Sequence, residues 1–234
     1  IEIQGNVSTT WLGTVDLQGA GTVTVKSTYT MTMGSSSAMI LGATDDFIIE
    51  TNATATHLLG DPSGIQISAR NITINGELNA SARGCAGGQT NGGVGQGPDI
   101  ITGICAPSTS GYGKADGGGA AHGGSGGVAW GGGNSDQASV YGSSTMPILL
   151  GSGGGSSFAL YAGGPGGNGG GRISLTVSGD LTVNGKIWAK GGDGVTNADT
   201  SSGGGSGGSV YIRVAGQVSG TGTIAADGEI GRAH

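Results

Sequence analysis

The clearest repeat in the chain is Gly171-Arg-Ile-Ser-Leu-Thr-Val-Ser-Gly-Asp-Leu-Thr-Val-Asn-Gly-Lys-Ile-Trp-Ala189. Apolar side chains alternate with polar ones on both sides of its Asn-Gly step, which is the period of a strand with one buried face. Two further units keep the same register: an apolar residue lies four positions before a glycine, and others lie two and four positions after it. The units span 64–80, 171–189 and 208–228, and a shorter echo spans 17–25. We therefore predict pairs of short strands repeated along the chain.

Two all-β architectures satisfy this pattern. In a parallel β-solenoid, or β-helix, each rung buries its apolar face and pairs its backbone with the next rung. The alternative is a β-sandwich of antiparallel hairpins, because an Asn-Gly step commonly reverses the chain. One face of each strand carries Ile, Leu, Val and Ala while the other carries Thr, Ser, Asn and Lys, which favours the solenoid. Less regular rungs are expected at 31–33, 38–41 and 47–49.

Composition narrows the class of protein. The chain has 234 residues, of which 56 are glycine and 5 are proline, a content often found in low-complexity chains. Its hydrophobic residues (35%) come in alternating runs, however, which indicates an ordered chain. The net charge of −6, without a basic block, argues against nucleic-acid partners. No apolar run approaches the roughly 20 residues of a membrane-spanning helix.

The glycines concentrate in the middle of the chain. We divide one structural domain into N-terminal β rungs with glycosylation sequons (1–83), a glycine-rich excursion (84–171) and C-terminal β rungs (172–234). The excursion is interpreted either as a flexible linker or as polyglycine-II-like packing, in which bare backbones exchange hydrogen bonds. The tracts are Gly117–Gly127, Gly131–Gly133, Gly151–Gly155, Gly163–Gly171 and Gly203–Gly208. Ordering each glycine costs about 0.5–1 kcal/mol relative to alanine, so hydrogen bonds, a disulfide or burial between subunits must offset it.

Cysteines and sequons indicate an oxidising, extracellular setting. Cys85 and Cys105 bracket the first part of the excursion and are expected to form a disulfide. No histidine lies near them, so no zinc site, and no cofactor, is expected. Four Asn-x-Ser/Thr sequons are candidate N-glycosylation sites: Asn6, Asn52, Asn71 and Asn79. Residue 1 is Ile, which suggests a removed signal peptide or a segment of a longer precursor.

Enzymatic motifs are weak. Gly-x-Ser-x-Gly occurs at 123–127 and 204–208, but no strand-to-helix context follows either copy. A polysaccharide lyase or hydrolase on a β-helix would need acidic and basic groups on neighbouring rungs. The candidates are Asp45 and Asp46 with His57, or Asp180 with Arg172 and Arg213. Turn-capping aspartates and solvated charges explain them more simply, so we predict no catalytic residues.

Aromatic side chains offer a binding alternative. Trp11, Trp130 and Trp188 could stack on sugar rings. Trp188 lies between Ile187 and Ala189, so alternation points it away from the rung interior, and Tyr211 alternates outward in the same way. An outward aromatic residue indicates a subunit interface or a glycan contact.

Three stretches carry a resemblance: Gly203-Gly-Gly-Ser-Gly-Gly-Ser-Val-Tyr-Ile-Arg-Val214, Ser219-Gly-Thr-Gly-Thr-Ile-Ala-Ala-Asp-Gly228 and Gly163-Gly-Pro-Gly-Gly-Asn-Gly-Gly-Gly-Arg-Ile173. They resemble repeats of large, mostly uncharacterised glycine-rich secreted or surface proteins of protists, plants and bacteria. The match covers about half of the chain. The glycine tracts are also similar, more weakly, to tail-fibre adhesins built on packed polyglycine helices, from which the sequons and rung-like strands depart. The resemblance implies an extracellular, structural or adhesive role.

Together these features predict a secreted, non-enzymatic structural protein, the repeating subunit of a fibre, wall or surface appendage. Its partners would be other copies in a homo-oligomer or filament, without membrane insertion. A glycan-binding adhesin that contacts a cell-surface polysaccharide is the alternative, and a polysaccharide-acting enzyme is the third candidate.

Overall fold

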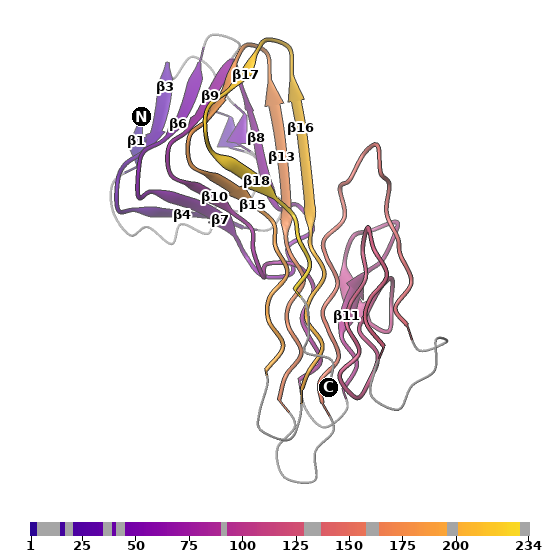
Figure 1. Ribbon diagram of the computed structural model, residues 1–234. Coiled ribbons are helices and arrows are strands. Elements are labelled where there is room, and N and C mark those ends of the chain that lie inside the picture. Colours follow the sequence, from indigo (N-terminus) through magenta and orange to yellow (C-terminus); the bar gives the residue numbers. More distant parts are fainter. Residues whose placement is uncertain are drawn as a thin grey trace.

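The computed structural model describes residues 1–3, 15–16, 21–34, 39–40, 45–89, 93–128, 137–157, 164–195 and 201–229. Within these ranges the fold is all-β, without helix, and consists of three parallel sheets and one antiparallel pair of strands (Figure 1). The predicted all-β class with parallel sheets is thereby confirmed.

The strands of the first sheet are β1 (Glu2–Ile3), β3 (Thr22–Val25), β6 (Asp46–Ile49), β9 (Asn71–Ile74), β14 (Leu181–Val183) and β17 (Val218–Ser219). Those of the second are β18 (Thr223–Ala225), β15 (Lys186–Trp188), β10 (Glu77–Asn79), β7 (Thr54–His57) and β4 (Thr30–Met33). Those of the third are β16 (Ser209–Val214), β13 (Arg172–Val177), β8 (Ile65–Ala69), β5 (Met39–Ile40) and β2 (Val15–Asp16). The antiparallel pair is β11 (Gln96–Pro98) and β12 (Cys105–Pro107).

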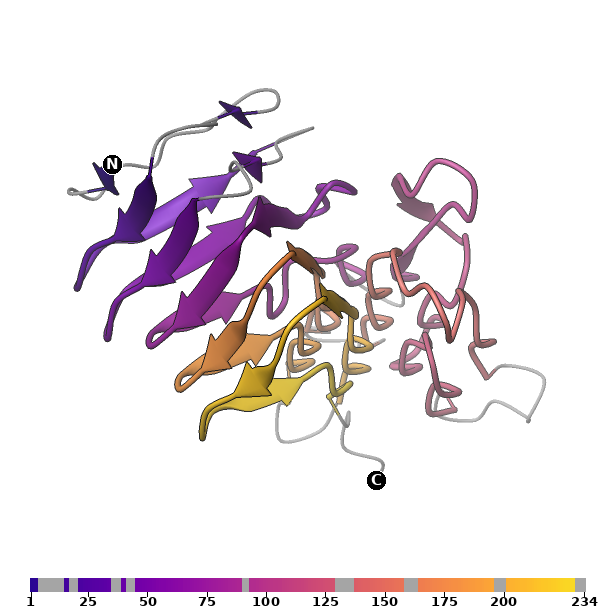
Figure 2. The same cartoon turned by 90° about the horizontal axis from the view of Figure 1, so that it is seen from above.

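Consecutive strands belong to different sheets. From β3 to β18 the chain visits the first, second and third sheets in turn, with only β11 and β12 outside this order. Each strand therefore pairs in parallel with a strand one circuit away, as the neighbouring strands in Figure 2 show. The hairpin alternative is wrong for these units, because β9 and β10 flank an Asn-Gly step without pairing with each other. The expected rungs at 31–33 and 47–49 lie within β4 and β6. Of the rung expected at 38–41, residues 39–40 form β5, and residues 38 and 41 lie outside the described ranges.

The register predicted from the repeat is also confirmed. Leu181 lies opposite Ile72 and Val218, and Ile187 lies opposite Leu78 and Ile224. The glycines of the step stack as well: a Cβ on Gly185 would collide with the carbonyl of Gly76, and one on Gly222 with that of Gly185. None of the three has a positive φ. Close stacking of backbones, rather than a reversing turn, therefore requires glycine there.

Residues 21–25 of the echo at 17–25 do not align with the other units as the sequence predicts, and residues 17–20 lie outside the described ranges. Its glycine, Gly21, should match Gly76 and place Val23 opposite Leu78. Val23 instead pairs with Phe47, which pairs with Ile72, so it belongs to the first sheet. Gly21 has a φ of +78°, and no atom beyond its chain neighbours lies within 4 Å of the place that a Cβ would occupy. Apolar alternation around a glycine therefore does not by itself tell which sheet a strand belongs to, when the sequence match is shorter than the full repeat unit.

All three sheets contribute inward side chains to one apolar core. On β13 these are Ile173, Leu175 and Val177, each at most 2% exposed, while the intervening Ser174 and Thr176 are not buried. Phe47, Ile72 and Leu78 are fully buried in the same cluster. Period-two alternation therefore selects the buried face of β8 and of β13.

The last circuit of strands is less well covered than the others. Strands β16, β17 and β18 each lie at the end of their sheet. Val218 is 62% exposed and Ile224 is 51% exposed, whereas Leu181 and Ile187, which lie opposite them, are fully buried. An apolar surface thus remains open at this end.

Candidate functional site

Within the described ranges, ten segments, most of them rich in glycine, lie side by side away from the sheets, and we call them the glycine bundle. They are residues 84–88, 93–97, 111–114, 117–121, 124–127, 151–157, 164–171, 189–195, 201–208 and 226–229. Several leave or enter the strands directly: 164–171 runs into β13, 201–208 runs into β16, and 189–195 follows β15. In Figure 1 they extend beyond the sheets. Figure 2 views many of them almost down their own axes, so that they appear as small coils.

The segment 151–157 is the centre of this bundle. All seven of its residues are buried and all seven backbone N–H groups donate hydrogen bonds. Gly153 donates to the carbonyl of Gln96 (2.8 Å) and Gly154 donates to that of Gly167 (2.9 Å). The partners lie in six surrounding segments: 84–88, 93–97, 111–114, 117–121, 164–171 and 201–208. These segments are therefore ordered by backbone pairing, and the flexible-linker interpretation is wrong for them.

The bonds repeat every three residues. Gly151 and Gly154 both donate to the segment 164–171, and Gly153 and Ser156 both donate to 93–97. A period of three directs successive N–H and C=O groups to different neighbours around the segment axis. One segment can thus be paired on all sides, which a flat sheet does not allow.

Close approach of these backbones leaves no space for side chains. A Cβ on Gly154 would collide with the carbonyl of Gly203, and one on Gly169 would collide with that of Gly151. Gly95, Gly166 and Gly205 are enclosed by backbone in the same way. The glycine content of the sequence is therefore a packing requirement across most of the bundle.

Serines occupy the few places where a small side chain fits. Ser152 N–H donates to the Oγ of Ser206 (2.8 Å), and Ser157 N–H donates to the Oγ of Ser202 (3.1 Å). All four side chains are buried. Sequence reasoning treats such serines as ordinary parts of glycine-serine tracts, although an isolated Ser inside a glycine run is an available signal.

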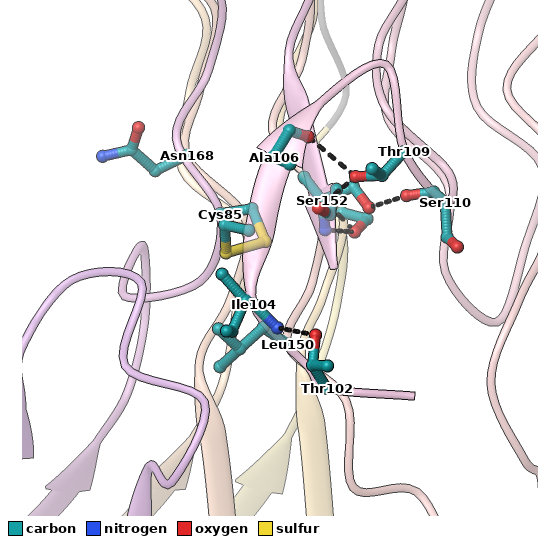
Figure 3. The surroundings of a disulfide bond; sticks show 12 residues. Cys85, Thr102, Ile104, Ala106, Thr109, Ser110, Leu150, Ser152 and Asn168 are labelled. Atoms are coloured by element: carbon teal, nitrogen blue, oxygen red, sulfur yellow. Dashed lines mark hydrogen bonds between the residues drawn. A yellow bond between two sulfur atoms is a disulfide. The ribbon is translucent and has the colours of Figure 1, made fainter. Parts of the chain in front are cut away.

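The predicted disulfide fastens the bundle to the antiparallel pair. Cys85, which is fully buried in the segment 84–88, is bonded to Cys105 of β12, with 5.3 Å between the Cα atoms (Figure 3). Nearby, Thr109 donates its hydroxyl proton to the carbonyls of Gly97 and Ala106, and the Oγ of Ser152 donates to the carbonyl of Ser110. Backbone bonds link the same regions, since Gln96 of β11 donates to the carbonyl of Ala86 (2.8 Å) and β11 pairs with β12.

His57 lies where the sheets meet the glycine bundle. It is fully buried at the end of β7; its Nδ1 is 2.8 Å from the carbonyl of Leu58 and its Nε2 is 3.3 Å from the backbone N of Arg172. A carbonyl can only accept, so Nδ1 carries the proton and Nε2 accepts from Arg172. Burial lowers the pKa of His57 to about 4. The neutral ring thus satisfies two backbone groups at the junction.

We expect this histidine to make stability fall as the pH is lowered. Because its pKa is about 4 in the folded protein and about 6.5 when unfolded, the unfolded chain takes up the proton first as pH drops. The stabilisation is complete above about pH 6.5 and is lost between there and pH 4, with about 2 kcal/mol lost from pH 8 to pH 5. Urea unfolding across this range measures the loss, and His57→Gln should flatten the profile. An equally steep profile in the variant would contradict the assignment.

The residues considered for catalysis do not converge. Asp46 pairs with Arg70 (3.1 Å) in the first sheet, whereas His57 belongs to the second and bonds to the backbone of Leu58 and Arg172. Asp180 accepts from the backbone N–H of Gln217 (2.8 Å). Arg172 donates instead to the carbonyl of Pro62. Asp45 is buried and accepts from the N–H of Gly21.

Of the aromatic residues considered for binding, Trp188 and Tyr211 lie within the described ranges, whereas Trp11 and Trp130 lie outside them. Both side chains are half-buried, on β15 and β16 respectively. The ring of Trp188 is contacted by the ammonium groups of Lys186 (4.4 Å) and Lys190 (4.7 Å), and its Nε1 donates to Thr223. These lysines occupy positions that a stacked sugar would need.

The sequons differ in their surroundings. Asn52 is exposed in a turn with φ of +64°. Asn71 donates its amide to Asp46 and accepts from the N–H of Asp180, and Asn79 donates its amide to Glu77. Asn6 lies outside the described residues.

Within the described ranges there is no group of three His, Cys, Asp or Glu side chains placed to bind a metal ion. A search of the same ranges also finds no helix with the length and apolar character needed to span a membrane. Comparison with known proteins finds no matching family model, and no curated protein or solved structure of significant similarity.

Proposed function

We propose that this chain is an extracellular structural protein, a subunit of a fibre, wall or surface appendage, in which a parallel β-solenoid carries a polyglycine-II-like bundle. The observation that carries the proposal is the segment 151–157, which is enclosed by six neighbours and hydrogen-bonded at every N–H. Such packing gives stiffness without side chains and offers bare backbone to a neighbour. The enzymatic alternative is not supported by the described candidates Asp46, His57, Arg172 and Asp180, which bond to other groups.

The open last circuit of strands supports assembly. Exposed Val218 and Ile224 continue two columns of side chains that are buried elsewhere, and burying such residues stabilises an association by about 25 cal/mol per Å². With only 10% charged residues, the chain has little repulsion to oppose contact between copies. We infer that subunits join where β17 and β18, which carry Val218 and Ile224, end the first and second sheets.

The direct test is electron microscopy of the native material together with light scattering of the purified protein. The proposal predicts filaments or larger assemblies, and a mass that rises with concentration. Isolated particles and a mass independent of concentration would contradict it.

A charge at the open end should block assembly. Val218→Asp and Ile224→Asp place carboxylates on side chains that are more than half exposed, so folding should be preserved while association is lost. Ile101→Asp is the matched control, because Ile101 is 88% exposed in the loop between β11 and β12. Sedimentation should show monomers for the first two variants and unchanged assembly for the control. Assembly that survives both changes would exclude this end as the contact.

Glycosylation should favour Asn52. The Nδ2 atoms of Asn71 and Asn79 each contact a carboxylate that would crowd an attached glycan, whereas Asn52 is exposed in a turn. In protein secreted from a eukaryotic host, Asn52→Gln should remove a glycan-sized mass. Asn71→Gln and Asn79→Gln serve as controls and should leave the mass otherwise unchanged. Loss of glycan only in the controls would reverse the assignment.

A further inference from the structure

The segment 201–208 is paired on every side except one. Gly203 and Ser206 donate to 151–157, while Gly205 and Gly208 donate to 189–195. Its carbonyls accept from 164–171, from Ala120, from Glu229 and from the ring of His122. Two N–H groups of this segment, those of Gly204 and Gly207, have no acceptor among the described residues. They mark the one side of the segment that is not paired.

The preceding circuit of the repeat shows what the N–H groups at these two positions contact when a further segment is present. Because Arg172 lies opposite Ser209, corresponding positions of the two circuits differ by 209 − 172 = 37 residues. Gly204 and Gly207 therefore correspond to Gly167 and Gly170. The latter two donate to the carbonyls of Gly203 and Ser206, which belong to the next glycine segment. The unpaired N–H groups of Gly204 and Gly207 thus occupy the positions from which, one circuit earlier, N–H groups donate to the next glycine segment.

A groove lies beside the segment 201–208. It has a volume of about 1010 Å³, and its lining includes the side chains of His122 and Tyr141 and the backbone of Gly207, whereas Gly204 lies beside it without lining it. The other lining residues come from 117–128, 140–147, 203–208 and 226–229. The ring of His122 stacks on that of Tyr141 (4.5 Å between centroids) and closes the groove near Gly207. At Gly123 and Gly124, which also line the groove, a Cβ would meet no atom within 4 Å beyond the chain neighbours. Both bare backbone and space are therefore available.

We propose that this groove and the free edge of β16 bind a glycine tract followed by an alternating strand, supplied by a partner chain. Carbonyl groups of the tract would accept hydrogen bonds from the N–H groups of Gly204 and Gly207. Its strand would pair in parallel with β16, as β16 does with β13. Glycine is required in the partner, because segments at this spacing leave no room for Cβ atoms. This inference rests on the proposed function, since it names a surface through which a partner joins.

The probe is a synthetic peptide with the sequence of residues 202–214, added to the purified protein and followed by calorimetry and by amide hydrogen exchange in NMR spectra. The matched control peptide has alanine at the positions of Gly203, Gly205 and Gly207, whose Cβ atoms would collide with neighbouring backbone. We expect binding of the first peptide only, with exchange at Gly204 and Gly207 slowed by roughly tenfold or more.

No binding, equal binding of the alanine peptide, or protection confined to other amides would overturn the proposal. Protection of Gly204 and Gly207 that rises with the concentration of the protein alone would identify a second copy as the occupant, and would overturn the assignment to a separate partner chain. The test is independent of the assembly experiments: filaments that persist while the peptide fails to bind would refute this site and leave the structural role intact.

Discussion

Gly154→Ala should destabilise the protein by about 3 kcal/mol, at the upper end for overpacking a buried site. The new methyl group would collide with the carbonyl carbon and oxygen of Gly203, which belong to a buried neighbouring segment and have little freedom to move. Relief would require separating 151–157 from 201–208 and would weaken the hydrogen bond from Gly203 to Gly155 (2.9 Å). The midpoint of urea unfolding measures this loss.

Gly124→Ala is the matched control. Gly124 is exposed, and a methyl group there would have no atom within 4 Å beyond its chain neighbours. Its substitution should change stability by no more than about 0.5 kcal/mol, with a small gain because alanine restricts the unfolded chain. Equal effects of the two substitutions would show that glycine acts in the bundle through flexibility and not through close contact.

Removing the disulfide should cost a comparable amount. Cys85 and Cys105 are 20 residues apart, and closing a loop of that size stabilises a protein by about 3 kcal/mol in the chain-entropy model. The bridge also ties the segment 84–88 of the bundle to β12, so its loss should increase amide exchange first in residues 96–107. Urea unfolding with and without reductant measures the change.

The double variant Cys85→Ala and Cys105→Ala provides the control for reductant effects. It should match the reduced protein in stability and should not respond to reductant. A reduced protein as stable as the oxidised one would mean that backbone pairing alone holds this region, and would contradict the contribution assigned to the bridge.

The strand repeats could be predicted because the alternation of apolar and polar side chains indicates which residues of a strand are buried. Alternation in 171–189 identifies Ile173, Leu175 and Val177 as core residues, and the common register places Leu181 beside Ile72. The echo at 17–25 misleads because one glycine with apolar neighbours fits two sheets equally well.

The bundle is harder to predict, because glycine has no side chain whose size or polarity would indicate which segments lie next to it. The sequence indicates that bare backbones could pack, but not that 151–157 is the central segment. His57 could not be predicted as a junction residue, since its partners are backbone atoms of Leu58 and of Arg172, the latter 115 positions along the chain. Long-range contacts to backbone leave no local pattern.

The most direct test of the backbone-paired bundle is residue-resolved amide hydrogen exchange of the native protein. Residues 151–157 donate every N–H within a buried environment, so their amides should exchange only through global unfolding. Gly123 and Gly124, which are exposed, should exchange many times faster. Rapid exchange throughout 151–157, at the rate of Gly123 and Gly124, would contradict the account.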